Sequence, residues 1–145
     1  MRTGKANFKM VDLVLTALSF LILAAATVWV ISHWDRIPDL IPTHYDFAGH
    51  VDAEGSKTSI WILPGFGFGI WLLFTVLAFV QGNAKADALT RTFLGVILLF
   101  ISALFSYLTL VQARGEPLSP VFVPLELLLL TGSVIVYLIL YQRVR

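Results

Sequence analysis

Long uncharged runs dominate the chain, and each is long enough to cross a membrane as a helix. A bilayer core about 30 Å thick is spanned by roughly 20 apolar residues in an α-helix. Four segments reach this length with almost no charge, at about 11–32, 60–80, 92–112 and 121–142. The pattern therefore predicts an all-α integral membrane four-helix bundle, formed by a single transmembrane domain over residues 1–145.

The first apolar run is interpreted as a retained helix rather than as a cleaved signal peptide. Its uncharged part, from Leu13 to Ser32, is longer than the about 7–15 residues of a usual signal sequence core. It also ends in Ile31, Ser32, His33 and Trp34, which do not make a small-residue cleavage site. We therefore expect this run to stay in the protein as the first span.

The connections and the basic residues predict the topology. Short connections follow the second and third runs, so helices 2, 3 and 4 are expected to be antiparallel neighbours. Lys and Arg collect on the cytoplasmic side of membrane proteins. With both termini in the cytoplasm, the inside holds seven of them: Arg2, Lys5, Lys9, Lys85, Arg91, Arg143 and Arg145. The outside holds three: Arg36, Lys57 and Arg114. The sequence thus predicts a multi-pass protein of the cell (cytoplasmic) membrane whose segment 34–60 faces outward.

Composition narrows the class of protein further. The chain is 58% hydrophobic, which is too apolar for a soluble domain of this size. Its net charge is only +1, which argues against nucleic acid as a partner. It has no cysteine, so disulfides, thiolate metal sites and cysteine nucleophiles are excluded. Membrane lipid is the partner that the composition implies directly.

Small residues mark two places where close helix packing is expected. On helix 3 they share one face, formed by Gly95, Ser102, Ser106 and Thr109. In helix 2, Gly65, Gly67 and Gly69 alternate with phenylalanine after Pro64. This is not a nucleotide-binding glycine loop, because no strand precedes it and it lies at membrane depth. Close packing, or a locally irregular start to helix 2, is the expectation there.

The outward segment 34–60, WDRIPDLIPTHYDFAGHVDAEGSKTSI, is too polar for the bilayer and too patterned for a passive linker. Pro38 and Pro42 push the chain toward an extended conformation. Gly49 and Gly55 are expected to supply turns. These features predict an ordered loop of definite shape that packs over the outer ends of the helices.

Part of this loop carries a family resemblance. The residues concerned are Pro38, Asp39, Ile41, Pro42, His44, Gly49, Asp52, Gly55, Ser56 and Lys57. Their order resembles the signature of the uncharacterised conserved domain at the N-terminus of SdpI-type bacterial immunity membrane proteins. Tyr45 and Asp46 stand where that signature has Phe and Asn, and Glu54 where an aromatic residue is common. The resemblance implies an integral protein of the bacterial (or archaeal) cytoplasmic membrane. One class of members protects its host from a secreted peptide toxin and also signals by holding a repressor at the membrane.

The first functional hypothesis is that the loop is a recognition surface. Trp34, Tyr45 and Phe47 are suitable anchors for a peptide or another membrane protein. Five acids, Asp35, Asp39, Asp46, Asp52 and Glu54, outnumber Arg36 and Lys57. A loop with this excess of negative charge would attract a cationic peptide.

A second hypothesis is a divalent metal site. The candidate donors are His44, Asp46, His50 and Asp52, which are nitrogen and oxygen ligands close together in sequence. Their spacing matches no established metal motif. A third hypothesis is structural, with His44 and Asp52 hydrogen-bonded to each other or to Lys57 and pinning the loop to the bundle. No cofactor is expected otherwise, and a small accessory subunit of a larger membrane complex is the alternative function.

Enzymatic activity is not expected. Ser56, His44 and Asp52 have the residue types of a hydrolytic triad, but no nucleophile elbow or oxyanion motif accompanies them. Ser56 is more simply a turn residue or a helix cap. We therefore predict no catalytic residue, and a metal-dependent hydrolase is the remaining enzymatic alternative.

One acid, Glu126, lies inside an apolar run, near the outer end of helix 4. An acid at membrane depth is costly and is a functional candidate by default. Lys57, Arg114 and His44 are its candidate partners. At helical spacing, its face continues through Leu130, Ser133, Tyr137 and Tyr141, and this stripe is expected to point into the bundle.

Overall fold

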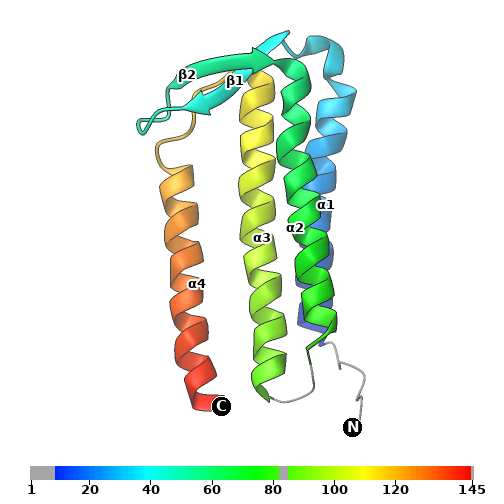
Figure 1. Ribbon diagram of the computed structural model, residues 1–145, viewed down its shortest axis with the longest axis vertical. Helices are drawn as coiled ribbons and strands as arrows, with labels where there is room; N and C mark the ends of the chain where they lie inside the picture. Colours follow the sequence, from blue (N-terminus) through cyan, green and yellow to red (C-terminus); the bar gives the residue numbers. More distant parts are fainter. Residues whose placement is uncertain (1–8, 82–84, 145) are drawn as a thin grey trace.

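The computed structural model describes residues 9–81 and 85–144, which form four long helices and a small β-hairpin (Figure 1). The helices are α1 (Met10–Ser32), α2 (Ile62–Phe79), α3 (Lys85–Arg114) and α4 (Phe122–Val144). All four are long and apolar enough to span a membrane. The predicted all-α four-helix membrane bundle is therefore confirmed. The start of α1 and the end of α4 lie at one end of the bundle, and the hairpin lies across the other.

The outward segment is more regular than the sequence predicted. It contains two short 3-10 helices, η1 (Trp34–Arg36) and η2 (Lys57–Trp61), and two strands, β1 (Leu40–Tyr45) and β2 (Val51–Ser56). The strands pair antiparallel, with Leu40 opposite Ser56 and Tyr45 opposite Val51. Strands were not predicted because this segment lacks alternating β-branched residues.

One turn prediction in this segment is wrong. Gly49 forms the turn between the strands, with φ of +86°, but Gly55 lies within β2 opposite Ile41. A Cβ atom on Gly55 would lie 2.8 Å from Thr43 Cγ2. Gly55 therefore allows the two strands to approach closely rather than turning the chain.

The predicted small-residue face of α3 packs against α1. A Cβ atom on Gly95 would lie only 3.0 Å from Leu15 Cβ, and Ser106 Oγ donates to the carbonyl oxygen of Ile22 at 3.2 Å. Ser102 and Thr109, from the same face, are buried. The expected close helix approach is confirmed, and α1 is the partner.

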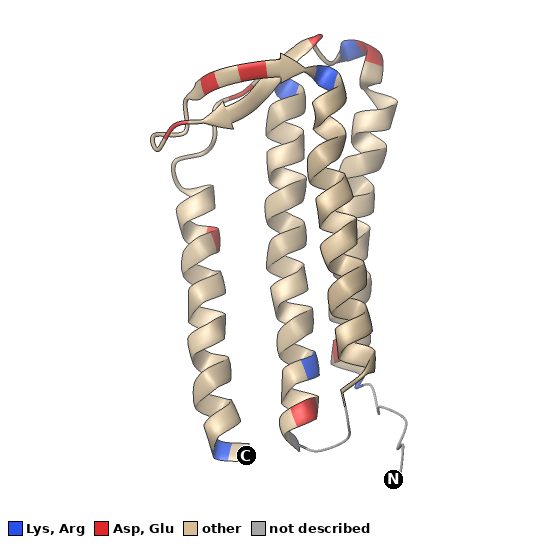
Figure 2. Cartoon of the chain, in the orientation of Figure 1, with Lys and Arg blue, Asp and Glu red and all other residues tan. Residues whose placement is uncertain are grey.

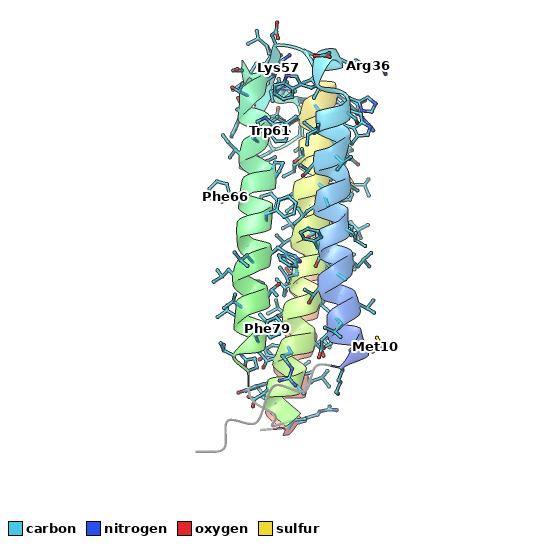
Figure 3. All side chains as sticks on the ribbon, turned by 90° about the vertical axis from the view of Figure 1, so that its right-hand side faces the viewer. Met10, Arg36, Lys57, Trp61, Phe66 and Phe79 are labelled. Atoms are coloured by element: carbon cyan, nitrogen blue, oxygen red, sulfur yellow. The ribbon has the colours of Figure 1, made fainter. Side chains whose placement is uncertain are left out.

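The glycines of α2 have different surroundings. A Cβ atom on Gly67 would lie 2.7 Å from Leu23 Cδ2 of α1, whereas Gly65 and Gly69 have nothing within 4 Å. The helix is regular from Ile62 onward, with Pro64 in its first turn, where proline is tolerated. Gly67 alone shows the expected close packing, and the irregular start is not observed. Phe66 points away from the bundle (Figure 3).

The fourth helix packs against α3. Tyr137 stacks on Phe93 at 4.1 Å between ring centroids, and Phe122 stacks on Tyr107 at 4.0 Å. In the most apolar 18-residue stretch of α3, 33% of the residues are buried, whereas in the corresponding stretch of α4 only 6% are buried. Most of the α4 surface is therefore available to lipid or to a partner.

Most charged residues lie toward the two ends of the bundle, and one acidic position lies within α4 (Figure 2). Arg36 and Lys57 lie at the hairpin end (Figure 3), and Arg114 ends α3 there. Lys9 precedes α1 at the opposite end. Three of the seven residues assigned to the cytoplasm, Arg2, Lys5 and Arg145, lie outside the described residues, as does the side chain of Lys85.

Candidate functional site: the outer hairpin

The hairpin is fastened to the bundle by a small apolar core at the outer ends of the helices. Its buried members are Val30, Ile37, Ile41, Ile60 and Ala113, with Trp29 and Trp34 packed against them. They come from α1, the segment that follows it, β1, η2 and α3. The prediction that the loop packs over the ends of the helices is confirmed.

Charge and aromatic contacts hold the base of the hairpin. Lys57 Nζ lies 3.4 Å from Asp39 Oδ1 and 5.0 Å from the centroid of the Trp34 ring. Trp34 in turn stacks on Trp61. The Arg114 guanidinium lies 5.4 Å from the centroid of the Trp29 ring. Lys57 and Arg114 are thus engaged beside α1 and α2.

His44 pairs with Asp52 across the hairpin. The distance between His44 Nδ1 and Asp52 Oδ1 is 2.5 Å, and both side chains are exposed. The hydrogen bond predicted between these residues is confirmed, and Lys57 binds Asp39 instead. Ser56 accepts a hydrogen bond from the Thr58 backbone N–H at 3.4 Å and caps η2, as predicted. Ser56 is thus occupied as a cap.

The turn at the hairpin tip is built around Asp46. Its Oδ1 accepts from the backbone N–H groups of Ala48 at 2.8 Å and His50 at 2.9 Å. These hydrogen bonds, first of all the one from the His50 backbone, lower the pKa of Asp46 below its ordinary value. The turn presents Phe47, whose side chain is fully exposed. The tip therefore displays an aromatic ring on an ordered backbone.

The four candidate metal donors form two pairs. One pair is His44 with Asp52. The other is His50 with Asp46, with 3.2 Å between His50 Nδ1 and Asp46 Oδ2. Within residues 9–81 and 85–144, no three His, Asp or Glu side chains are grouped closely enough to hold a metal ion. Each pair by itself offers two ligands, fewer than a four-coordinate zinc site needs.

The hairpin tip is also tied to the connection between α3 and α4. Leu118 donates its backbone N–H to the Gly49 carbonyl oxygen at 2.8 Å. A Cβ atom on Gly49 would lie 2.9 Å from the Leu118 carbonyl oxygen. Gly49 therefore meets two requirements, the positive φ of the turn and close approach to Leu118. The close approach to Leu118 could not be predicted from sequence, because Leu118 is about 70 residues away along the chain.

Two open cavities lie beneath the hairpin, at the outer ends of α3 and α4. One, of about 350 Å³, is lined by residues that include Tyr45, Gln112 and Val123. The other, of about 440 Å³, is lined by residues that include Phe47 and Val123. Leu118 lines both. The cavities therefore adjoin each other between the hairpin tip and the start of α4.

The first cavity contains two polar atoms without partners. Among the described residues, the Tyr45 hydroxyl and Gln112 Oε1 are buried and make no hydrogen bond. Burial, with a smaller effect of neighbouring Tyr107, raises the pKa of Tyr45 to about 12. The Tyr45 hydroxyl is therefore protonated at neutral pH and is a hydrogen-bond donor. Gln112 was not singled out by its sequence position, because a lone Gln near a helix end carries no signal.

Glu126 is buried on α4, with 8% of its surface exposed. Its Oε1 has no hydrogen-bond partner in the described part of the chain. Two of its candidate partners are engaged elsewhere, Lys57 with Asp39 and Arg114 with Glu116. Further along the predicted stripe, Tyr137 stacks on Phe93 of α3, so the stripe does point into the bundle.

Comparison with known families gives one match. Residues 20–68 match the model of a family described as a domain of unknown function (DUF1648). No curated protein and no solved structure matches the chain. The matched region runs from within α1 through the whole hairpin into α2. This match supports the predicted uncharacterised conserved domain, and the matched residues include both His–Asp pairs, Phe47 and Lys57.

Proposed function

We propose that this chain is a non-enzymatic membrane protein whose outer hairpin recognises a peptide or another membrane protein. The observation that carries the proposal is the construction of the tip. Asp46 fixes the turn, Leu118 holds it from below, and Phe47 is left fully exposed. An aromatic side chain displayed on a rigid backbone binds with little loss of conformational entropy.

The proposed setting is a bacterial cytoplasmic membrane, with both termini in the cytoplasm. The excess of Lys and Arg assigned to the terminal side of the sequence supports this orientation. The resemblance of the loop to SdpI-type immunity proteins supports a protective role against a secreted peptide. The positions that carry this resemblance lie within residues 20–68, the part that matches the uncharacterised domain.

The non-enzymatic part of the proposal is supported by the arrangement of the triad residue types. Ser56 lies opposite Leu40 at the base of the hairpin, and Ala53 is opposite His44 nearer the tip. The Ser56 hydroxyl lies 3.0 Å from Thr58 Oγ1, within hydrogen-bond distance. Nucleophilic catalysis needs the hydroxyl within hydrogen-bond reach of its base. The side-chain partner of the Ser56 hydroxyl is Thr58 rather than His44, which supports a role other than that of a nucleophile.

Site-specific photo-crosslinking tests recognition. A benzophenone amino acid is placed at position 47 in the full chain expressed in bacterial membranes, and at position 66 as a matched control. Phe66 is also an exposed phenylalanine, but on α2. We expect a discrete cross-linked protein or peptide from position 47 only. The same products from both positions would contradict recognition by the hairpin.

Protection tests the immunity role. Bacteria expressing the wild-type chain are exposed to a panel of secreted membrane-active peptides, and growth inhibition is compared with that of cells expressing Phe47→Ala. We expect the wild type to tolerate a higher concentration of at least one peptide, and the variant to lose this tolerance. Equal sensitivity of both strains to every peptide would contradict the immunity role.

A second candidate is a small accessory subunit of a larger membrane complex, with a divalent metal held by the hairpin. It is favoured by the mostly exposed apolar surface of α4. Its test is the metal content of the purified protein, wild type against His44→Ala with Asp52→Ala. Stoichiometric metal that disappears in the variant supports this candidate, and its absence from the wild type contradicts the metal.

A further inference from the structure

Charge is unevenly distributed along the outer face. On the side of α1, Lys57 lies over the ring of Trp34 and Arg114 lies over the ring of Trp29. The other half of the hairpin, which lies above the start of α4, carries acids and, within the described residues, no Lys or Arg (Figures 1 and 2). These acids are Asp46 and Asp52, and Glu54 follows along β2, opposite Pro42. The tip half of the hairpin therefore favours a positively charged partner.

Apolar surface adjoins Asp46 directly, because Asp46 lines the cavity of about 440 Å³. Phe47 lines the cavity of about 440 Å³ together with Leu118, Val123 and Leu127. The apolar residues of this cavity come from the hairpin tip, the α3–α4 connection and α4. Since α4 is predicted to cross the membrane from this point, the cavity opens at the boundary between lipid and water. A molecule that binds there needs an apolar face as well as positive charge.

The neighbouring cavity is lined in part by Tyr45 and Gln112. The Tyr45 hydroxyl and Gln112 Oε1 are themselves buried and make no hydrogen bond among the described residues. The surface that the cavity offers to a ligand is therefore mainly apolar, from side chains such as Leu104, Leu108 and Leu118.

We propose that a cationic amphipathic peptide binds between the start of α4 and the tip of the hairpin that covers it. Its apolar side chains occupy the two cavities against Phe47 and Val123, and its Lys and Arg side chains face Asp52 and Glu54. This rests on the proposed recognition function and specifies its location and the chemistry of the partner. A second copy of the chain is a poorer occupant, because two acidic tips repel each other.

Binding of a model peptide tests the proposal. The full chain is reconstituted in phosphatidylcholine nanodiscs, which carry no net lipid charge. The probe is a fluorescein-labelled 14-residue peptide of Leu and Lys, arranged to be amphipathic as a helix, and the matched probe replaces Lys with Glu. Fluorescence anisotropy is measured against empty nanodiscs, which account for binding to lipid alone.

Two variant pairs locate the site. Phe47→Ala is compared with Phe66→Ala, and Glu54→Gln with Asp35→Asn; all four side chains are exposed, so none is needed for folding. We expect Phe47→Ala to weaken binding of the Leu/Lys peptide by about tenfold, as for an interface anchor. Glu54→Gln should weaken it by about threefold. The two controls should leave it unchanged.

Three outcomes would overturn the proposal. They are binding no tighter than to empty nanodiscs, equal binding of the Leu/Glu peptide, and equal effects of Phe47→Ala and Phe66→Ala. If the peptide does not bind but position 47 still cross-links to one partner in bacterial membranes, recognition stands and the cationic peptide is wrong. If neither is observed, the proposed function fails as well.

Discussion

The contact between α1 and α3 differs in kind from the contact between α3 and α4. The first is made by small residues and buried polar groups, including Gly95 against Leu15 and Ser106 bonded to the Ile22 carbonyl. The second is made by two aromatic stacks, Tyr137 on Phe93 and Phe122 on Tyr107. Cavities also lie along the second contact, one of about 270 Å³ between α3 and α4 in addition to those under the hairpin.

The difference shows what holds helices together in lipid. Apolar burial gives little driving force there, so close backbone approach and interhelical hydrogen bonds determine which helices associate tightly. α1 and α3 satisfy this requirement along their length. α4 has large side chains at its contact and a mostly exposed apolar surface. The bundle therefore consists of a tightly packed part and a more loosely attached helix beside the proposed peptide site.

The end of the α1–α3 contact opposite the hairpin should be the most sensitive point of the bundle to substitution. Asp12 and Arg91 are each 2% exposed. Asp12 accepts a hydrogen bond from the Thr92 hydroxyl at 2.6 Å, and its Oδ2 lies 3.9 Å from Arg91 Nε. Asp12→Ala removes the negative charge beside a buried guanidinium, which should lower the free energy of unfolding by about 3–5 kcal/mol.

The measurement for Asp12→Ala is equilibrium unfolding in mixed detergent micelles, with Asp35→Ala as the matched control because Asp35 is exposed. The control should change stability by less than about 0.5 kcal/mol. If both variants are equally stable, the α1–α3 contact does not depend on its buried polar network.

Two of the three glycines of α2, Gly67 and Gly69, should differ in their tolerance of a larger side chain. Gly67→Leu forces a side chain toward Leu23 and Phe105, and overpacking of this kind costs about 1–3 kcal/mol. Gly69→Leu enters open space and gains helix propensity, up to about 1 kcal/mol. Thermal unfolding of both variants in one detergent checks this. Equal losses at both positions would mean that α2 packs on both faces.

Substitution of Glu126 tests the looser contact, between α3 and α4, and should change stability least of the three predictions. Glu126→Leu removes a buried oxygen that has no described partner and should stabilise the attachment of α4 by about 1–2 kcal/mol. Glu126→Gln keeps a polar group and should leave stability close to the wild type. Hydrogen exchange of the α4 amides is the measurement. Faster exchange in Glu126→Leu would show that Glu126 has a stabilising partner and that α4 is held more specifically.

Much of the fold followed from the apolar pattern. The four spans were predicted to within a few residues, except that α3 begins at Lys85 rather than near residue 92. Its first two turns contain Asp87 and Arg91, which hydropathy alone assigned to a loop. Arg91 is buried near Asp12, and no local signal pairs residues 79 positions apart. The polar network at the end of the bundle opposite the hairpin was therefore not predicted.

The candidate site was predicted only in part. His44 and Asp52 lie eight residues apart, and their pairing followed from sequence because a short loop brings such residues together. The partners of the hairpin tip, Leu118 and Val123, belong to the other end of the chain. Packing of a loop against distant helices depends on shape and register, which periodicity does not encode.

The sequence by itself determined that the chain forms four membrane helices with an ordered, acidic loop between the first two. The physical reason is local, since the length of an apolar run and the placement of proline and charge act on neighbouring residues. Only the tertiary structure decided that the loop is a hairpin, that α1 and α3 pack tightly, and that Phe47, Tyr45 and Gln112 surround cavities beside α4. These features arise from close approach between segments far apart along the chain, where single side chains such as Gly49 and Gly67 set the distance.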